Sequence, residues 1–233
     1  MENLPNLKTA RAIEFLTSAR ENHKRQSKDF PFMIPKRKPR FDYQNLPETE
    51  RLRYELLTWD NYKQMFDLFQ NDPNPFVMDD FKTIEDLEMY AVSQLEYNWY
   101  SFKRGACDWF LWSKDTSELV GVLHLYDLNW ELYEGKHPSC TVGYAIGEKY
   151  RRKGFAFEAM SHLLTQIPLI FKRYEVGANP KIANINSRYL LEKLGFIEHK
   201  EVGDDESWWE KQLVEEIPLK TSDEVWEEEK KYR

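Results

Sequence analysis

The chain has 233 residues, of which 41% are hydrophobic and 15% aromatic, and its formal net charge is -7. This composition excludes an intrinsically disordered protein, and no apolar stretch approaches the roughly 20 residues of a membrane-spanning helix. Two cysteines outside any C-x-x-C pair and five scattered histidines argue against a disulfide framework and against a metal site. The N-terminus does not resemble a signal peptide. We therefore expect a soluble, cytoplasmic domain with an appendage.

The first 49 residues are predicted to form an amphipathic, basic arm. Prolines after residue 30 favour an extended connection to the main domain. Residues 20–40 carry eight Lys or Arg against two acidic residues, whereas residues 198–233 carry thirteen acidic residues against six basic ones. We expect an arm over 1–49, a main domain over 50–214 and an acidic tail over 215–233. Apolar residues recur at helical spacing in the arm, at Leu7, Ala10, Ile13, Leu16 and Ala19.

The main domain is predicted to be a mixed α/β (α+β) domain of order βααβββαβαββ. Thr83, Asn184 or Asn186, and Gly195 are typical of helix ends, and Gly143 of a bulge. Strands are expected over 51–57, 107–113, 119–128, 141–146, 174–178, 196–202 and 208–214. Helices are expected over 59–69, 83–100, 154–171 with a bend at Pro168, and 187–194.

The most informative segment, residues 147–156, joins a predicted strand to a predicted helix. It places Arg151, Arg152 and Lys153 directly before Gly154, with Ala156 in the first helical turn. Free amides and the positive end of the helix dipole favour an anion there, and small residues let the backbone approach it closely. The segment therefore suits a pyrophosphate, although a solvated basic loop explains the same pattern. It lacks the glycine motifs of nucleoside triphosphatases and dinucleotide folds.

A second segment, residues 184–196, follows the next predicted strand. Together the two segments resemble the GNAT superfamily of acyl-CoA-dependent N-acetyltransferases. The first matches [QR]-x-x-G-x-[GA] at Arg151, Gly154 and Ala156. The second is similar to the N-x-x-S-x-x-x-x-E-K-x-G-F of the branch that acetylates ribosomal-protein N-termini beginning with alanine or serine. The resemblance covers residues 50–214 and implies a mostly antiparallel twisted sheet, flanked by helices and splayed between its fourth and fifth strands.

The resemblance also implies a site for acetyl-CoA as cosubstrate. Its pantetheine would pair with backbone of the fourth strand, which the family carries with a bulge, and its pyrophosphate would bind the following turn. Asn184 is a further candidate contact, although capping the helix explains it equally well. The implied contacts are therefore Tyr144, Ala145, Ile146, Arg151, Arg152, Lys153, Gly154, Phe155, Ala156 and Asn184.

The catalytic residues follow the resemblance only in part. Many relatives carry a tyrosine as general acid where this chain has Leu191, so Ser187 is the candidate acid, although a Ser in a first helical turn also suits capping. Relatives often carry a glutamate base at a position that corresponds to Cys140 or Thr141, neither of which is a convincing base. A base acting directly or through water, or positioning alone, stays open, with the candidates His124, Glu131, Glu134, His137 and Glu201.

The sequence thus predicts transfer of an acetyl group to a primary amine of a protein N-terminus or a small molecule. The alternative is a GNAT-fold acyl-CoA-binding or protein-interaction module with little turnover, which the missing tyrosine and glutamate favour. We expect a monomer or homodimer, with neither a membrane nor a nucleic acid as partner. The acceptor pocket should lie between the two early helices and the last strand pair, which carry Trp99, Tyr100, Trp208 and Trp209.

Overall fold

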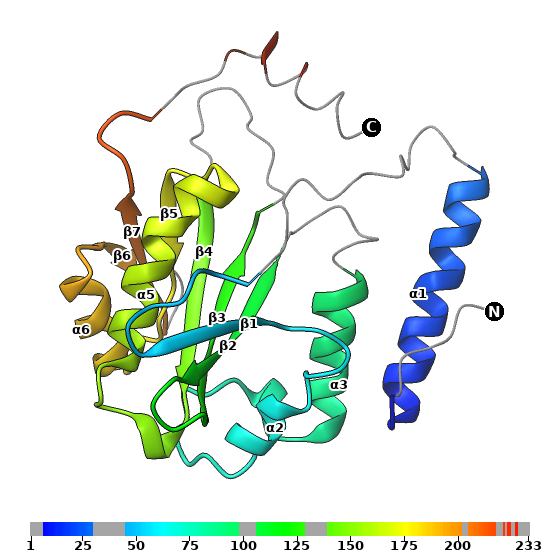
Figure 1. Cartoon of the computed structure of the whole chain (residues 1–233). Coiled ribbons are helices and arrows are strands. Elements are labelled where there is room, and N and C mark those ends of the chain that lie inside the picture. The colour runs from blue at the N-terminus through cyan, green and yellow to red at the C-terminus, as the bar shows by residue number, and fades with distance from the viewer. Residues whose placement is uncertain are drawn as a thin grey trace.

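A seven-stranded sheet of order β1-β2-β3-β4-β5-β7-β6 forms the centre of the protein (Figure 1). The computed structural model describes residues 7–29, 45–97, 106–128, 139–201, 205–217, 221, 223–224 and 227. Neighbouring strands are antiparallel except for the parallel pair β4 and β5, which confirms the predicted sheet. The strands are β1 (Leu52–Leu56), β2 (Cys107–Ser113), β3 (Leu119–Tyr126), β4 (Ser139–Ile146), β5 (Glu175–Ala178), β6 (Ile197–Glu201) and β7 (Ser207–Gln212).

Helices lie on both faces of this sheet, and several are shorter than predicted. Thr83 caps α3 as expected, because its hydroxyl accepts the Asp86 N–H at 3.1 Å. The regular part of α5 ends before Pro168, which has no N–H to donate, and a wider π-helical turn follows. The α-helices are α1 (Ala10–Asp29), α2 (Gln64–Phe69), α3 (Ile84–Val92), α5 (Phe155–Gln166) and α6 (Ile185–Lys193). Single turns are η1 (Asp79–Phe81), η2 (Ser93–Tyr97), η3 (Glu148–Tyr150) and η4 (Ile167–Phe171).

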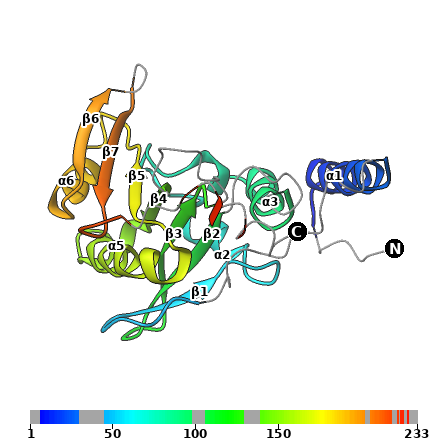
Figure 2. The ribbon, with the colours of Figure 1, turned by 90° about the horizontal axis from the view of Figure 1, so that it is seen from above.

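Two apolar cores separate the sheet from its helices (Figure 2). Successive side chains of a strand point to opposite faces, so Phe110 packs with the α2 and α3 side and Leu111 with the α5 side. Both are fully buried. Among the described residues, no helix combines the length and apolar character needed to cross a membrane.

The arm helix α1 packs against α3 on the side away from the sheet (Figure 2). Leu7, Ala12 and Leu16 form a third apolar cluster with Val92 of α3. Ile13, which was predicted to share this face, is instead 37% exposed, so the predicted stripe was wrong in part. The expected connection over 30–44 and most of the acidic tail lie outside the described residues. The division of the chain near residues 49 and 214 stays a prediction.

A buried carboxylate holds the start of this arm. Glu88 of α3 accepts the backbone N–H groups of Lys8 and Thr9 at 2.8 and 2.7 Å and the Tyr62 hydroxyl at 3.1 Å. Amides at a helix N-terminus have no partner within the helix, so the carboxylate satisfies donors that would otherwise be unpaired. Burial disfavours the charged form of Glu88, but these hydrogen bonds outweigh it and lower its pKa.

We predict that Glu88→Gln destabilises the protein by about 1 to 3 kcal/mol, because an amide places a donor against backbone N–H groups. Urea unfolding and amide exchange in α1 measure this effect, and the exposed Glu85→Gln on the same helix is the control. Since the pKa of Glu88 is lower in the folded state, its contribution is complete above the unfolded value of 4.5 and disappears as the pH falls through the folded value. Equal stability of the two variants would contradict the assigned contact.

Candidate active site

The site begins where β4 and β5 separate. Their parallel pairing runs from Ser139 and Glu175 to Thr141 and Gly177, whereas β4 continues to Ile146. Gly177 is required at this point, because a Cβ on it would overlap the Trp208 ring of β7. The structure thus confirms the predicted splay between the fourth and fifth strands.

The far end of β4 leaves backbone groups without a strand partner. Its register with β3 is continuous from Thr141 to Ile146, so the bulge expected at Gly143 is absent from this pairing. The Gly147 N–H donates to the Val120 carbonyl at 3.0 Å, and the alternation of an antiparallel ladder then directs the N–H and C=O of Tyr144 towards the β5 side. The backbone N–H and C=O of Ala145 point the opposite way, towards β3. The splay therefore supplies the free backbone groups that the bulge was expected to supply.

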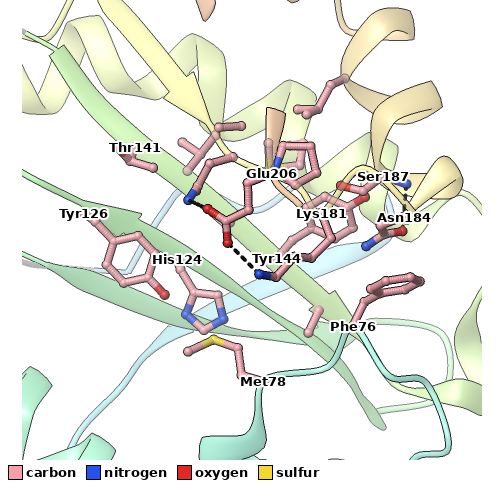
Figure 3. A pocket seen from close by; sticks show the side chains of 18 of the residues that line it. Phe76, Met78, His124, Tyr126, Thr141, Tyr144, Lys181, Asn184, Ser187 and Glu206 are labelled. Carbon is pink, nitrogen blue, oxygen red and sulfur yellow. Dashed lines mark hydrogen bonds and ion pairs between the residues drawn. The ribbon is translucent and has the colours of Figure 1, made fainter. Parts of the chain in front are cut away.

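A cavity of about 770 Å³ occupies this opening (Figure 3). This volume lies within the range of ordinary ligand pockets. Residues 141–145 of β4 form one wall, and α6 contributes Asn184, Ser187 and Leu191. Figure 3 shows Asn184 and Ser187 at one end of the cavity and His124 and Tyr126 at the other.

The turn before α5 provides unpaired amides close to the end of β4. Arg152 and Gly154 have φ values of 60° and 84°, and α5 begins directly afterwards at Phe155. Within the described part of the chain, the N–H groups of residues 152–157 donate to no acceptor. Alternating left-handed residues and a helix N-terminus arrange such amides around an anion. This turn does not line the cavity itself, and it has the geometry of a separate phosphate subsite.

Arg151 of this turn has a structural partner. Its guanidinium pairs with Asp72, whose side chain is 1% exposed, and its Nε donates to the Ile146 carbonyl at 2.9 Å. Burial disfavours the charged form of Asp72, but Arg151, with the Asn74 N–H and the charge of Lys82, outweighs it and lowers the Asp72 pKa. Arg151 thus ties the strand end to the segment after α2, and its implied contact with the cofactor stays a prediction. Arg152 and Lys153 are exposed.

We predict that Arg151→Met destabilises the protein by about 3 kcal/mol, because the buried Asp72 carboxylate would lose the guanidinium that pairs with it and keep weaker partners such as the Asn74 N–H. The exposed Arg152→Met should change the free energy of unfolding by less than about 0.5 kcal/mol. Urea unfolding of the two variants gives the comparison. A loss of stability in Arg152→Met as large as in Arg151→Met would contradict the role of the pair.

Asn184 and Ser187 meet at the start of α6. The Asn184 side-chain oxygen accepts the Ser187 N–H at 3.2 Å, so Asn184 is the residue that caps the helix. Burial raises the pKa of the Tyr144 phenol, and the nearby Ser187 side chain opposes this shift. Tyr144 and Ser187 both line the cavity, so the predicted acid lies at its wall.

The candidate bases differ in whether they lie within the described residues. Glu131, Glu134 and His137 lie outside the described residues, as does the side chain of Glu201, whereas His124 lines the cavity. Cys140 is buried, which raises its pKa to about 12, and the Thr141 hydroxyl donates to Asp127 at 2.8 Å. In the described residues, no group of three or more His, Cys, Asp and Glu side chains is arranged to hold a metal ion.

The aromatic residues expected around the acceptor have different places. Trp208 lines the cavity, while Trp209 is 5% exposed and belongs to the core. Trp99 and Tyr100 lie outside the described residues. The sequence analysis missed Asp108, whose carboxylate lies 2.8 Å from His124 Nδ1. A single charged residue in the otherwise uncharged strand 107–113 was the available signal.

Comparisons with known proteins agree with this geometry. A family model described as an acetyltransferase (GNAT) domain matches residues 51–197. The uncharacterized N-acetyltransferase YoaA of Bacillus subtilis is 28% identical over 151 residues, which are 64% of this chain and 81% of that protein. A [ribosomal protein uS5]-alanine N-acetyltransferase of Escherichia coli is 30% identical over 95 residues, 40% of this chain and 47% of that protein.

Solved structures show the same fold. A spermidine N-acetyltransferase of Vibrio cholerae superimposes with a TM-score of 0.54 at 16% identity, covering 71% of this chain and 95% of that one. The chain therefore belongs to the GNAT acetyltransferase family. Its class is that of an N-acetyltransferase, and enzymes of this family use acetyl-CoA as cosubstrate.

Proposed function

We propose that the protein transfers the acetyl group of acetyl-CoA to a primary amine in the cavity between β4 and β5. The observation that carries this proposal is the end of strand pairing at Thr141 and Gly177, which leaves the backbone of Tyr144 facing a cavity. The acceptor is a protein N-terminus, as for the uS5 relative, or a small amine, as for the spermidine enzyme.

The described residues fit acetyl-CoA in two places. The free N–H and C=O of Tyr144 suit the amides of a pantetheine arm, and the amides of residues 152–156 suit a pyrophosphate. The Ile146 carbonyl is already bound by Arg151, so Ile146 has only its N–H to offer. The cosubstrate supplies an activated thioester, and the chain supplies position and proton transfer.

Two groups of the protein at the cavity serve the reaction, a free N–H of β4 and the Ser187 hydroxyl. A neutral amine nitrogen attacks the thioester carbon, and a free N–H of β4 stabilises the charge that develops on the carbonyl oxygen. As the C–S bond breaks, the Ser187 hydroxyl donates a proton to the leaving sulfur. Holding both substrates in one cavity makes the attack effectively intramolecular.

We predict that Gly154→Val abolishes the thermal stabilisation that acetyl-CoA gives to the wild-type protein. A side chain there blocks the approach of phosphate and strains a φ of 84° by about 1 to 2 kcal/mol. Gly195→Val is the matched control, since Gly195 also has a positive φ, of 78°, but follows the C-terminal end of α6 and not the turn before α5. Retained stabilisation in Gly154→Val, or its loss in Gly195→Val, would place the phosphates elsewhere.

Ser187→Ala should lower kcat about 100-fold and leave the affinity for acetyl-CoA within about 2-fold, because only the proton donor is removed. Ser161→Ala on α5, whose hydroxyl does not line the cavity, should retain full activity. Steady-state kinetics with an amine that the protein acetylates provides the measurement. Wild-type kcat in Ser187→Ala would reassign the proton donor.

The function is tested with acetyl-CoA and a panel of amines, comprising peptides that begin with alanine or serine and spermidine. We expect CoA release together with a mass increase of one acetyl group on at least one amine. Thermal stabilisation by acetyl-CoA without acetylation of any amine would favour the binding module, and the absence of stabilisation at millimolar acetyl-CoA would overturn the proposal.

A further inference from the structure

We propose that His124 is the general base of the reaction and that Asp108 and Tyr90 position it. The inference rests on the proposed function and adds the residue that takes the proton from the acceptor amine. In the sequence, His124 was one of five open candidates, and its sequence context did not distinguish it from the others.

A row of directly paired residues brings the base to the cavity. Asp108 of β2 pairs with His124 of β3, and His124 pairs with Gly143 of β4. Directly opposite residues of a sheet project from the same face, so the carboxylate lies beside the imidazole. Asp108 and His124 are each 2% exposed, and Asp108 Oδ1 lies 2.8 Å from His124 Nδ1.

Tyr90 of α3 contacts both members of this pair. Its hydroxyl donates to the other oxygen of Asp108 at 2.9 Å and lies 3.1 Å from His124 Nδ1. An ionised carboxylate only accepts hydrogen bonds, so it holds the imidazole proton on Nδ1. The neutral ring then carries its lone pair on Nε2, the atom needed to accept a proton.

His124 Nε2 is the ring nitrogen that the fold leaves without a hydrogen-bond partner in the described part of the chain. It is buried and has no hydrogen-bond partner among the described residues, although the ring lines the cavity. A buried polar atom without a partner costs free energy, which a bound amine would recover. Figure 3 places the imidazole beside Tyr126 and Met78 within the cavity.

The surroundings fix the plane of the ring. Phe81 and Tyr126 stack on it with centroid distances of 5.9 and 5.7 Å. The titratable groups that face His124 from the packed elements are Asp108, Asp80 of η1, Tyr90 and Tyr126. Burial raises the pKa of Tyr90 and of Tyr126, and the Asp108 carboxylate raises both further, so neither phenol competes as a base.

With His124 as base and Ser187 as acid, the protons of the acetyl-transfer step balance. The amine lone pair forms the C–N bond, and the electron pair of the C–S bond leaves with sulfur. Nε2 takes the surplus proton from nitrogen, while Ser187 gives one proton to the thiolate. One proton is removed and one is supplied in each turnover, so return of the His124 proton to Ser187 through solvent restores the enzyme.

The first test uses the resting protein and needs no acceptor. Long-range proton–nitrogen NMR of the wild type, with His124→Gln to assign the signal, should show neutral His124 protonated at Nδ1 and bare at Nε2. Asp108→Asn should move part of the population to the other tautomer. A wild-type imidazole protonated at Nε2 at neutral pH would overturn the proposal without touching the proposed function.

The second test uses whichever amine the panel identifies. His124→Gln should lower kcat by at least about 100-fold, keep the KM for acetyl-CoA within about 2-fold and remove the acidic limb of the kcat profile against pH. Asp108→Asn should lower kcat, because an amide no longer holds the imidazole proton on Nδ1. His162→Gln is the matched control, since His162 Nε2 is also buried and unpartnered in the described residues but does not line the cavity.

The outcomes separate the two proposals. Acetyl transfer by His124→Gln at the wild-type rate, or an equal loss in His162→Gln, overturns the assignment of the base and leaves the proposed function intact. Binding of acetyl-CoA by the wild type without transfer to any amine overturns the proposed function. Loss of acetyl transfer in His124→Gln but not in His162→Gln, together with a wild-type His124 protonated at Nδ1, supports both proposals.

Discussion

The separation of β4 from β5 determines where ligands can enter this fold. The Trp208 ring lies over Gly177, and the chain beyond β5 passes through Pro180, whose carbonyl accepts the Ser207 N–H at 3.1 Å. β5 is thereby drawn towards β7 while β4 continues along β3. The unpaired backbone of Tyr144 and the cavity both follow from this divergence.

The charged residues near the site serve the fold more than the ligand. Arg151 belongs to the signature by which the family resemblance was identified, yet its charge is balanced by the buried Asp72. In the proposed function the pyrophosphate is bound by amides at the start of α5, which carry partial positive charge. A protein with a net charge of -7 can therefore offer a site to a pyrophosphate, because backbone dipoles act locally.

Local signals predicted much of the fold. The strand 107–113 has the predicted bounds, since a run of aromatic and branched residues between turn residues favours an extended chain. Thr83 and Asn184 cap helices as expected, because each bond spans three residues. The exposed Ile13 was assigned to the wrong face, because α1 is oriented by Glu88, which lies 79 positions from Thr9.

The sequence by itself determined the family, because two short motifs carry the resemblance. It also determined the turn around Gly154 and the capped start of α6, because these features depend on hydrogen bonds and backbone angles within a few residues. Only the tertiary structure decided that Arg151 pairs with Asp72 and that His124 meets Asp108 beside the cavity. Those contacts join residues 79 and 16 positions apart, and the packing of separate elements and the β2–β3 register bring them together. A proton acceptor needs such an arrangement, since its ionisation depends on neighbours in space.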